Sequence, residues 1–417
     1  MDERPRPAPR SVAWLGSGLG IAQLIAWGTI YYAIAVLSEP MQRDLALSRS
    51  EFYGLFTWSL ALSGLLAPWA GRLVDRIGGR MVLVAGVMLG ALGFSILAGA
   101  QSAWMLGIGW TVEGVAMALG LYDTCFAAVG QAAPHAYRRA VTAVTLIAGL
   151  ASTCFWPISH YLVEALGWRS TCGVFVVLLV ACVPLYLLVL PPHARGTSAL
   201  SGRAGDEPPS DQPGANGFAR MLALAFAGAA LVSGALSVHL VGALGWLRFS
   251  PEHAVWIASS IGVMQVLGRF VELRFGTGLS AHRLGLLTFA SMTISLVLLL
   301  AAAVLPPAVL LFAVLYGAAN GAMTIVKAVL PVEMFGTREV GAVLGRFSAP
   351  SLVTRAAAPW AYALSEQAFN GTGGALSLLV SVSVCSLCIY VYVLRRRANA
   401  RDQARAPWEC GPRSLVG

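Results

Sequence analysis

The sequence has few charged residues. Aspartate, glutamate, lysine and arginine make up only 11% of the 417 residues, against roughly 25% in soluble domains. Hydrophobic residues account for 57%, and the mean hydropathy is +0.73. A soluble core cannot bury so many apolar side chains, whereas a lipid bilayer surrounds them. The scarcity of charge therefore predicts a protein that crosses a membrane several times, with the lipid bilayer as its surroundings.

Lysine and histidine are also scarce, and neither they nor the cysteines form a nucleotide-binding, metal-binding or catalytic motif. The only lysine is Lys327, which follows Val326, so the Gly-Lys pair of a Walker A loop is absent and an ATP-driven pump is excluded. The six histidines show no H-x-x-x-H spacing. Most cysteines lie inside apolar runs and are interpreted as small core residues, including Cys385 and Cys388. We therefore expect no cofactor and no metal, and a membrane-embedded enzyme or receptor, the remaining alternative class, lacks a reactive constellation.

Apolar runs of membrane-spanning length organise the chain into two groups. We expect an all-α membrane protein with twelve transmembrane helices and the following domains: a cytoplasmic arm at 1–10, a six-helix half at 11–192, a linker rich in Gly, Pro and Ser at 193–217, a second six-helix half at 218–394, and a cytoplasmic tail at 395–417. The expected helices are 12–37, 51–70, 81–100, 103–129, 140–162 and 171–190, then 218–247, 251–273, 284–305, 308–334, 340–364 and 374–394. We expect Arg395, Arg396 and Arg397 to stop the last helix.

The net charge of +9 is distributed in a way that argues against nucleic acid as a partner. Most arginines fall in the segments that this topology assigns to one side of the membrane, and such a bias marks the cytoplasmic side. We therefore expect a multi-pass protein of a bacterial-type inner membrane, with both termini cytoplasmic.

A short charged stretch between the second and third expected helices carries the most specific signal. Residues 71–80 read GRLVDRIGGR, which resembles motif A of the major facilitator superfamily, G-x-x-x-D-R-x-G-R-R, with Gly79 in place of the first closing basic residue. A weaker copy, GRFVELR at 268–274, follows the eighth expected helix about half a chain later. The resemblance implies a secondary transporter of two pseudo-symmetric six-helix halves, with its site between them near the midplane. The fold works as a monomer.

The same resemblance implies a gating role for this stretch. In the family, the motif braces the second helix against the eleventh when the protein is outward-open. The gating residues expected here are Gly71, Arg72, Asp75, Arg76, Gly78 and Arg80, with Arg346 and Glu339 as partners near the start of the eleventh helix. Gly71 allows two helices to approach closely, and Asp75 can accept from backbone N–H groups at a helix start.

Four charged residues fall inside expected helices, where a charge is costly and marks a function or an internal pair. They are Glu113, Asp123, Lys327 and Arg355. Family resemblance places the first three on cavity-lining helices. Asp123 and Lys327 lie at similar depth, about two turns from the inner helix ends, so we expect them to pair across the halves; pairing within each half is the alternative. Because burial disfavours the charged form of a carboxyl group, Glu113 and Asp123 are the candidate proton-coupling residues, with the proton as coupling ion.

Polar stripes indicate where a substrate would bind. Tyr316, Asn320 and Lys327 share one face of the tenth expected helix, and Gln23, Trp27 and Tyr31 recur at intervals of four in the first. Arg355 suits a carboxylate or a phosphate, which a guanidinium binds with two parallel hydrogen bonds; a structural pairing with Glu113 or a backbone carbonyl is the other interpretation. These residues are the candidate substrate-binding set.

The expected function is transport of a small organic anion, in symport with a proton. The surroundings of Tyr31 and Tyr32, together with the motif, are loosely similar to the bacterial monocarboxylate and oxalate–formate branch of the superfamily, which implies a monocarboxylate. A proton-driven exporter of drugs or metabolites is the alternative. Such an exporter would have a Met- and aromatic-lined cavity and would tolerate loss of Arg355.

Overall fold

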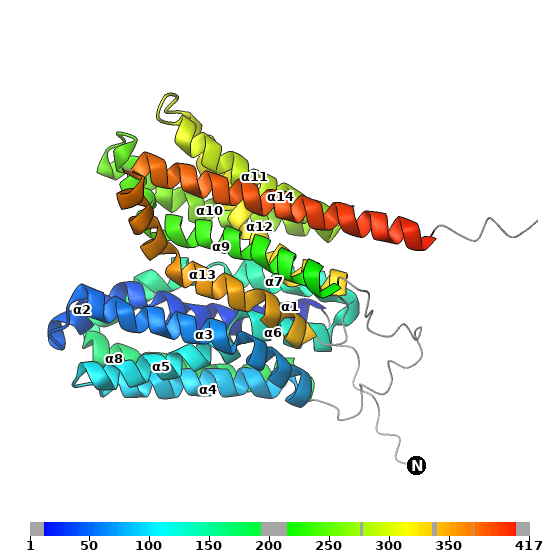
Figure 1. Cartoon of the computed structure of the whole chain (residues 1–417). Helices are drawn as coiled ribbons and strands as arrows, with labels where there is room; N and C mark the ends of the chain where they lie inside the picture. The colour runs from blue at the N-terminus through cyan, green and yellow to red at the C-terminus, as the bar shows by residue number, and fades with distance from the viewer. Residues whose placement is uncertain (1–11, 193–214, 276–277, 336–339, 370, 406–417) are drawn as a thin grey trace, which may run out of the picture.

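The computed structural model describes residues 12–192, 215–275, 278–335, 340–369 and 371–405. These residues form helices and contain no β-strand. Figure 1 shows two helical layers, with α1 to α8 in one and α9 to α14 in the other. The layers correspond to the N-terminal and C-terminal halves that the sequence predicts.

The N-terminal half begins with a broken helix and continues with long ones. The break is a π-helical turn, η1, between α1 and α2. A single turn, η2, precedes α7. The bounds are α1 Val12–Ala26, η1 Trp27–Tyr32, α2 Ile34–Asp44, α3 Arg49–Ile77, α4 Gly79–Ala98, α5 Ala103–Gly120, α6 Tyr122–Ala132, η2 Pro134–Ala136, α7 Tyr137–Ala148 and α8 Ala151–Val189.

The C-terminal half consists of six longer helices. They are α9 Ala215–Trp246, α10 Pro251–Phe275, α11 Ala281–Ala301, α12 Ala308–Phe335, α13 Val340–Ala368 and α14 Thr372–Arg405. The two halves meet mainly where α13 packs along α3. The end of the bundle at which α3 ends and α13 begins is called the motif end below, because it carries residues 71–80.

Each of the twelve expected segments overlaps one or more described helices, although several expected ends lie a few residues beyond the observed ones. Nine helical stretches among the described residues are long and apolar enough to cross a membrane. One of these, Pro134–Val189, holds both the fifth and the sixth expected segments, separated at Gly167, where the backbone is not helical. The helices α3 and α13 are not among the nine. The all-helical fold is confirmed, and the count of twelve spans stays a prediction.

The fourth expected segment is broken in the structure. At Leu121 the backbone becomes extended, with φ −93° and ψ −165°, which separates α5 from α6. A break exposes carbonyl groups that have lost their helical partners. The Gln23 side chain donates to Gly120 O at 2.7 Å, and Thr124 Oγ1 donates to Ala118 O at 2.9 Å. The break is therefore stabilised by side chains, and it places Asp123 in the first turn of α6.

The prediction for Gln23 as a substrate-binding residue needs correction. Its side chain is fully buried, and its Nε2 donates to Gly120 O and also lies 3.2 Å from Tyr186 Oη. The helical period of four places Gln23, Trp27 and Tyr31 on one face only if the helix is regular. The π-helical turn that begins at Trp27 alters that period, so Gln23 points into the helix packing.

The end of the last helix also differs from the prediction. We expected Arg395, Arg396 and Arg397 to stop it, but α14 continues to Arg405. Arginine, alanine and glutamine favour helix, and cationic side chains near a helix C-terminus interact favourably with the helix dipole. The expected arm at 1–10, most of the linker and the end of the tail lie outside the described residues.

We expect Gln23→Leu to destabilise the protein, because it leaves the Gly120 carbonyl buried without its donor. Such a loss costs about 1–3 kcal/mol. The thermal unfolding temperature of the purified protein in detergent should fall. Gln101→Leu, at an exposed loop position, is the control and should leave it unchanged. A substitution at Gln23 that keeps the unfolding temperature but weakens ligand binding would restore the substrate-binding interpretation.

Candidate functional site

A cavity of about 830 Å³ lies between the two halves. Its lining comes from η1, α3, α5, α6, α7 and α8 of the N-terminal half and from α9, α10, α12 and α13 of the C-terminal half. The lining includes six of the predicted substrate-binding residues: Trp27, Tyr31, Tyr316, Asn320, Lys327 and Arg355. Helices that are distant in sequence therefore converge on one chamber, as expected for a site between two halves.

The charged residues of the described lining are three cations and one acid: Arg269, Lys327, Arg355 and Asp123. Lys327 Nζ lies 3.9 Å from Asp123 Oδ1, so the two form an ion pair from one half to the other. This is the pairing that the sequence suggested. With Asp123 and Lys327 balancing each other, the two arginines leave the cavity with excess positive charge.

Arg355 lies on α13, where it faces the cavity near several hydroxyl groups. Tyr31, Tyr32 and Tyr316 are all within electrostatic range of its guanidinium group. No ion pair to Arg355 exists among the described residues, and Glu113, one of the partners considered for it, also has no hydrogen-bond partner there. The guanidinium group is thus open to a ligand.

Arg269 is a cavity residue that sequence reasoning missed. It belongs to the weak motif copy at 268–274, which lies largely inside the eighth expected helix at 251–273. In the structure α10 continues to Phe275, so Arg269 lies within the helix and is only 6% exposed. Its Nε has no hydrogen-bond partner among the described residues. Its guanidinium group reaches Gly149 in the N-terminal half, where any side chain would collide with it. The hydrophobic pattern of the helix continues through residue 269, and this was the sequence signal that could have identified Arg269 as a residue of the helix.

The π-helical turn η1 supplies the aromatic part of the site. Trp27, Tyr31 and Tyr32 all line the cavity, and a π-helical turn often marks a functional position. Tyr316 and Asn320 face them from α12. Sequence spacing correctly placed Tyr316, Asn320 and Lys327 on one face, because α12 is continuous over this stretch.

Glu113 lies outside the cavity lining. It is fully buried in α5, both of its carboxylate oxygens lack a hydrogen-bond partner among the described residues, and its Oε1 would lie 2.6 Å from a Cβ at Gly93 of α4. An unpaired carboxylate is costly in such surroundings. Of the two candidate proton-coupling residues, only Asp123 lines the cavity.

The motif end is closed by a contact between α3 and the start of α13. Asp75 accepts hydrogen bonds from Gly341 N at 3.1 Å and Ala342 N at 2.8 Å. A carboxylate at a helix N-terminus also interacts favourably with the helix dipole. The two backbones touch here, because a Cβ at Gly71 would overlap the Gly341 carbonyl. Asp75 and Gly71 thus lie at a contact between the two halves, and their gating role stays a prediction.

The other predicted gating residues are arranged around this contact. Gly78 has φ +89°, a conformation that favours glycine, and connects α3 to α4. Arg72 and Arg76 are exposed, whereas Arg80 is half-buried. Arg346 is exposed on α13 and forms no ion pair among the described residues, so backbone N–H groups are the partners of Asp75 in its place. Glu339 lies outside the described residues.

The weak motif copy makes a second contact between the halves. Glu272 is only 6% exposed and takes the place that Asp75 has in the first motif. Its carboxylate accepts from Arg138 Nε at 2.9 Å and from Thr142 Oγ1 at 2.9 Å, both on α7. Arg138 also donates to the Leu279 carbonyl. At the motif end, Asp75 of the N-terminal half thus binds the C-terminal half, and Glu272 of the C-terminal half binds the N-terminal half.

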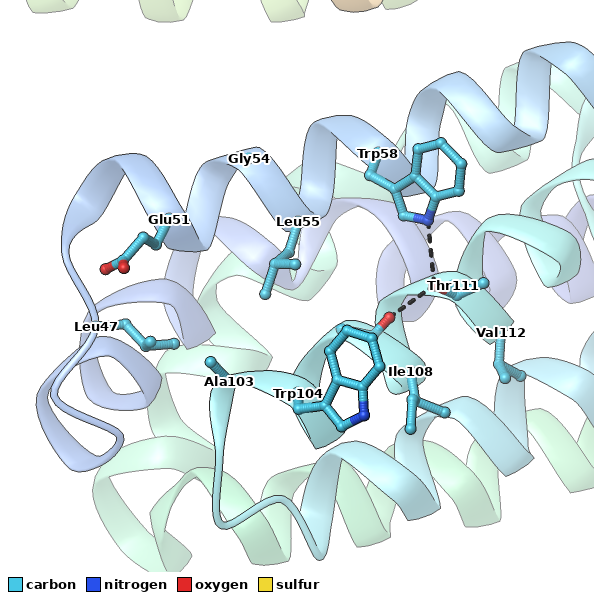
Figure 2. Close-up of a pocket in the computed structure, with 11 residues that line it drawn as sticks. Leu47, Glu51, Gly54, Leu55, Trp58, Ala103, Trp104, Ile108, Thr111 and Val112 are labelled. Atoms are coloured by element: carbon cyan, nitrogen blue, oxygen red, sulfur yellow. Dashed lines mark hydrogen bonds between the residues drawn. The ribbon is translucent and has the colours of Figure 1, made fainter.

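A second hollow lies on the outer surface of the N-terminal half, between α3 and α5 (Figure 2). Trp58 and Trp104 border it, and Trp58 Nε1 donates to Thr111 Oγ1 at 3.1 Å. Its one charged lining residue, Glu51, already accepts from Ser48. This groove has few polar groups and receives nothing from the other half, so the central cavity is the candidate functional site.

Comparison with known proteins agrees with this arrangement. Residues 19–212 match the family model of the Major Facilitator Superfamily. An uncharacterized MFS-type transporter of Bacillus subtilis (strain 168), YwfA, is 28% identical over 142 residues. That match covers 33% of this chain and 34% of the length of YwfA.

Solved structures share the fold over nearly the whole chain. The fucose transporter FucP in its outward conformation has a TM-score of 0.72, with 11% identity, 90% of this chain and 97% of FucP covered. The human organic anion transporter MFSD10 (TETRAN) has a TM-score of 0.65, with 14% identity, 92% of this chain and 100% of MFSD10 covered. The fold is thus the one found in these membrane transporters. The family match covers the N-terminal part of the chain, and the solved transporters share its fold over nearly the whole length.

We expect Asp75→Asn and Glu272→Gln each to loosen the motif end, because each removes a charge-assisted contact between the halves. Spin labels at the exposed positions 77 and 283, one in each half, should report a longer mean distance in both variants. The double variant should open further than either single one. Glu252→Gln, at the opposite end of α10, is the control. Unchanged distances in the double variant would show that neither carboxylate holds the motif end closed.

Proposed function

We propose that this protein is a secondary active transporter that moves an organic anion across the membrane by alternating access, coupled to a proton. The observation that carries the proposal is the central cavity, which is lined by both halves and contains more cations than acids. A monocarboxylate is the simplest substrate class for an open arginine such as Arg355.

Alternating access requires the cavity to be closed at one end and open at the other. The contacts of Asp75 and Glu272 close the motif end, and the cavity lining extends away from it to Val238 and Val241 near the far end of α9. Similarity to FucP in the outward conformation supports the same state. Breaking both carboxylate contacts would allow the halves to rock about the substrate.

Asp123 is the residue we assign to the proton. It pairs with Lys327 of the other half and lies in the first turn of α6, close to the cavity. Protonation of Asp123 would remove the attraction to Lys327 and leave Lys327 free for the anion. Binding of a proton and binding of an anion would thereby favour each other, which is the requirement for symport.

The membrane, the topology and the partners of the protein are part of the same proposal. We propose a bacterial-type inner membrane with both termini cytoplasmic, because the arginine-rich segments favour the inner side. The substrate is a small molecule, the lipid bilayer is the surrounding partner, nucleic acid is not a partner, and a single chain is sufficient because one chain contains both halves of the cavity.

A proton-driven exporter of amphipathic compounds is the second candidate. It is favoured by one observation, which is the presence of Met117, Met323 and several aromatic residues in the cavity lining. Methionine and aromatic side chains adapt to varied apolar ligands. This alternative differs from the first in its need for Arg355.

Arg355→Ala should abolish binding and transport of a labelled monocarboxylate, since the open guanidinium group is lost. Arg355→Lys should retain part of it, because a point charge remains but the two parallel hydrogen bonds do not. The measurement is tracer uptake in proteoliposomes with and without an inward proton gradient. Arg248→Ala, outside the cavity lining, is the matched control. Wild-type affinity in Arg355→Ala would contradict the anion proposal and favour the exporter.

Asp123→Asn should remove the stimulation of uptake by a proton gradient while tracer exchange across the membrane continues. Glu113→Gln is the carboxyl control and should keep the stimulation. If Glu113→Gln abolishes it, Glu113 is the proton site and our assignment is wrong. Exchanging the charges, with Asp123→Lys and Lys327→Asp together, should restore the ion pair between the halves that either single change removes.

A further inference from the structure

The two walls of the cavity differ in chemistry. The N-terminal half lines it with six aromatic residues and the C-terminal half with two, Phe226 and Tyr316. Three of the four charged lining residues, all cations, come from the C-terminal half. The six residues of the aromatic wall are Trp27, Tyr31, Tyr32, Tyr122, Phe126 and Trp156.

The rings of the aromatic wall form one connected series. Trp156 contacts Tyr32 with ring centroids 6.3 Å apart, and Tyr32 contacts Tyr31 at 5.1 Å. Tyr31 contacts Trp27 at 5.1 Å, and Trp27 contacts Tyr122 at 4.8 Å. Aromatic pairs at these separations prefer edge-to-face or offset arrangements. The series therefore presents a broad apolar surface with polar groups at its edges.

One polar group of this wall has no partner. Trp27 Nε1 is buried without a hydrogen bond among the described residues. A buried donor without an acceptor is unfavourable, and an oxygen of a bound ligand would satisfy it. On the opposite wall, Arg269 Nε is likewise unpartnered and the arginine is more than nine-tenths buried.

The two walls come together around Arg355. Tyr31 and Tyr32 of the aromatic wall line the same cavity as Arg355 and Arg269. A carboxylate bound to Arg355 is therefore placed beside the rings of η1. The rest of such a bound ligand then has the aromatic wall on one side.

We infer that the substrate is an aromatic carboxylate, an amphipathic anion whose ring packs on the aromatic wall while its carboxylate binds Arg355. This inference rests on the proposed function and makes it more specific. Acids of one or two carbons would leave most of the 830 Å³ cavity and the aromatic wall unused. A neutral aromatic compound would leave Arg269 and Arg355 without an anion.

The test is a binding series on the purified full-length protein in detergent, followed by tracer competition in proteoliposomes. The probes are phenylacetate, cyclohexylacetate, acetate and oxalate, with benzyl alcohol as the uncharged aromatic compound. We expect phenylacetate to bind about tenfold more tightly than acetate, because packing of a ring on the wall is worth that much. Cyclohexylacetate should fall between them, and benzyl alcohol should not compete.

Substitutions in the wall should remove the preference for the ring without removing anion binding. In Trp27→Leu and Tyr31→Leu, the affinity for phenylacetate should fall by a larger factor than the affinity for acetate, so the preference for phenylacetate over acetate should fall several-fold. Trp156→Leu, at the accessible end of the series, serves if the other two fail to fold. Trp104→Leu, on the outer groove and 82% exposed, is the matched control and should keep the preference.

Two failures are distinguishable. If acetate or oxalate binds as tightly as phenylacetate and Arg355→Ala weakens all of them, the aromatic inference is wrong and the anion transporter stands. If benzyl alcohol competes as well as phenylacetate, or if no carboxylate binds and Arg355→Ala changes nothing, the proposed function itself is wrong.

Discussion

The contact between the Asp75 carboxylate and the first N–H groups of α13 is the constraint on which the rest of the structure depends. It joins a helix of one half to a helix of the other at the point where Gly71 and Gly341 let their backbones meet. Because α13 also carries Arg355, the position of that guanidinium group is tied to the same contact. Glu272 makes the corresponding attachment from the other half. The closed motif end is thus held by two carboxylates related by the internal repeat.

A second constraint is the broken helix formed by α5 and α6. A break inside a membrane-embedded helix leaves carbonyl groups without water, and they need partners within the protein. Gln23 and Thr124 provide those partners. The new helix start places Asp123 where the dipole of α6 stabilises its charge, so the packing of α1 against the break supports the ion pair with Lys327. Stability and the charge chemistry of the cavity depend on the same few hydrogen bonds.

Much of the candidate site followed from the rule that a charge inside a membrane helix has a function or a partner. Asp123, Lys327 and Arg355 were predicted in this way and line the cavity. Glu113 satisfied the same rule and lies elsewhere, because the rule does not tell which face of a helix meets the cavity. Arg269 was missed because it was assigned to the motif copy, although the expected helix 251–273 already contained it. Asp123 was predicted although it lies beside the helix break at Leu121, because the rule depends on burial of charge and not on helix regularity.

The sequence by itself determined the helical class, the division into two halves and the position of the motif. These depend on local properties: apolar runs must match the bilayer, and every backbone polar group must be satisfied within its own helix. Only the tertiary structure decided that Gln23 caps a broken helix, that Arg269 reaches Gly149, and that an aromatic wall faces a cationic one. These arrangements depend on which helices become neighbours and on where a helix departs from its regular period. Neither is set by the residues of a single helix.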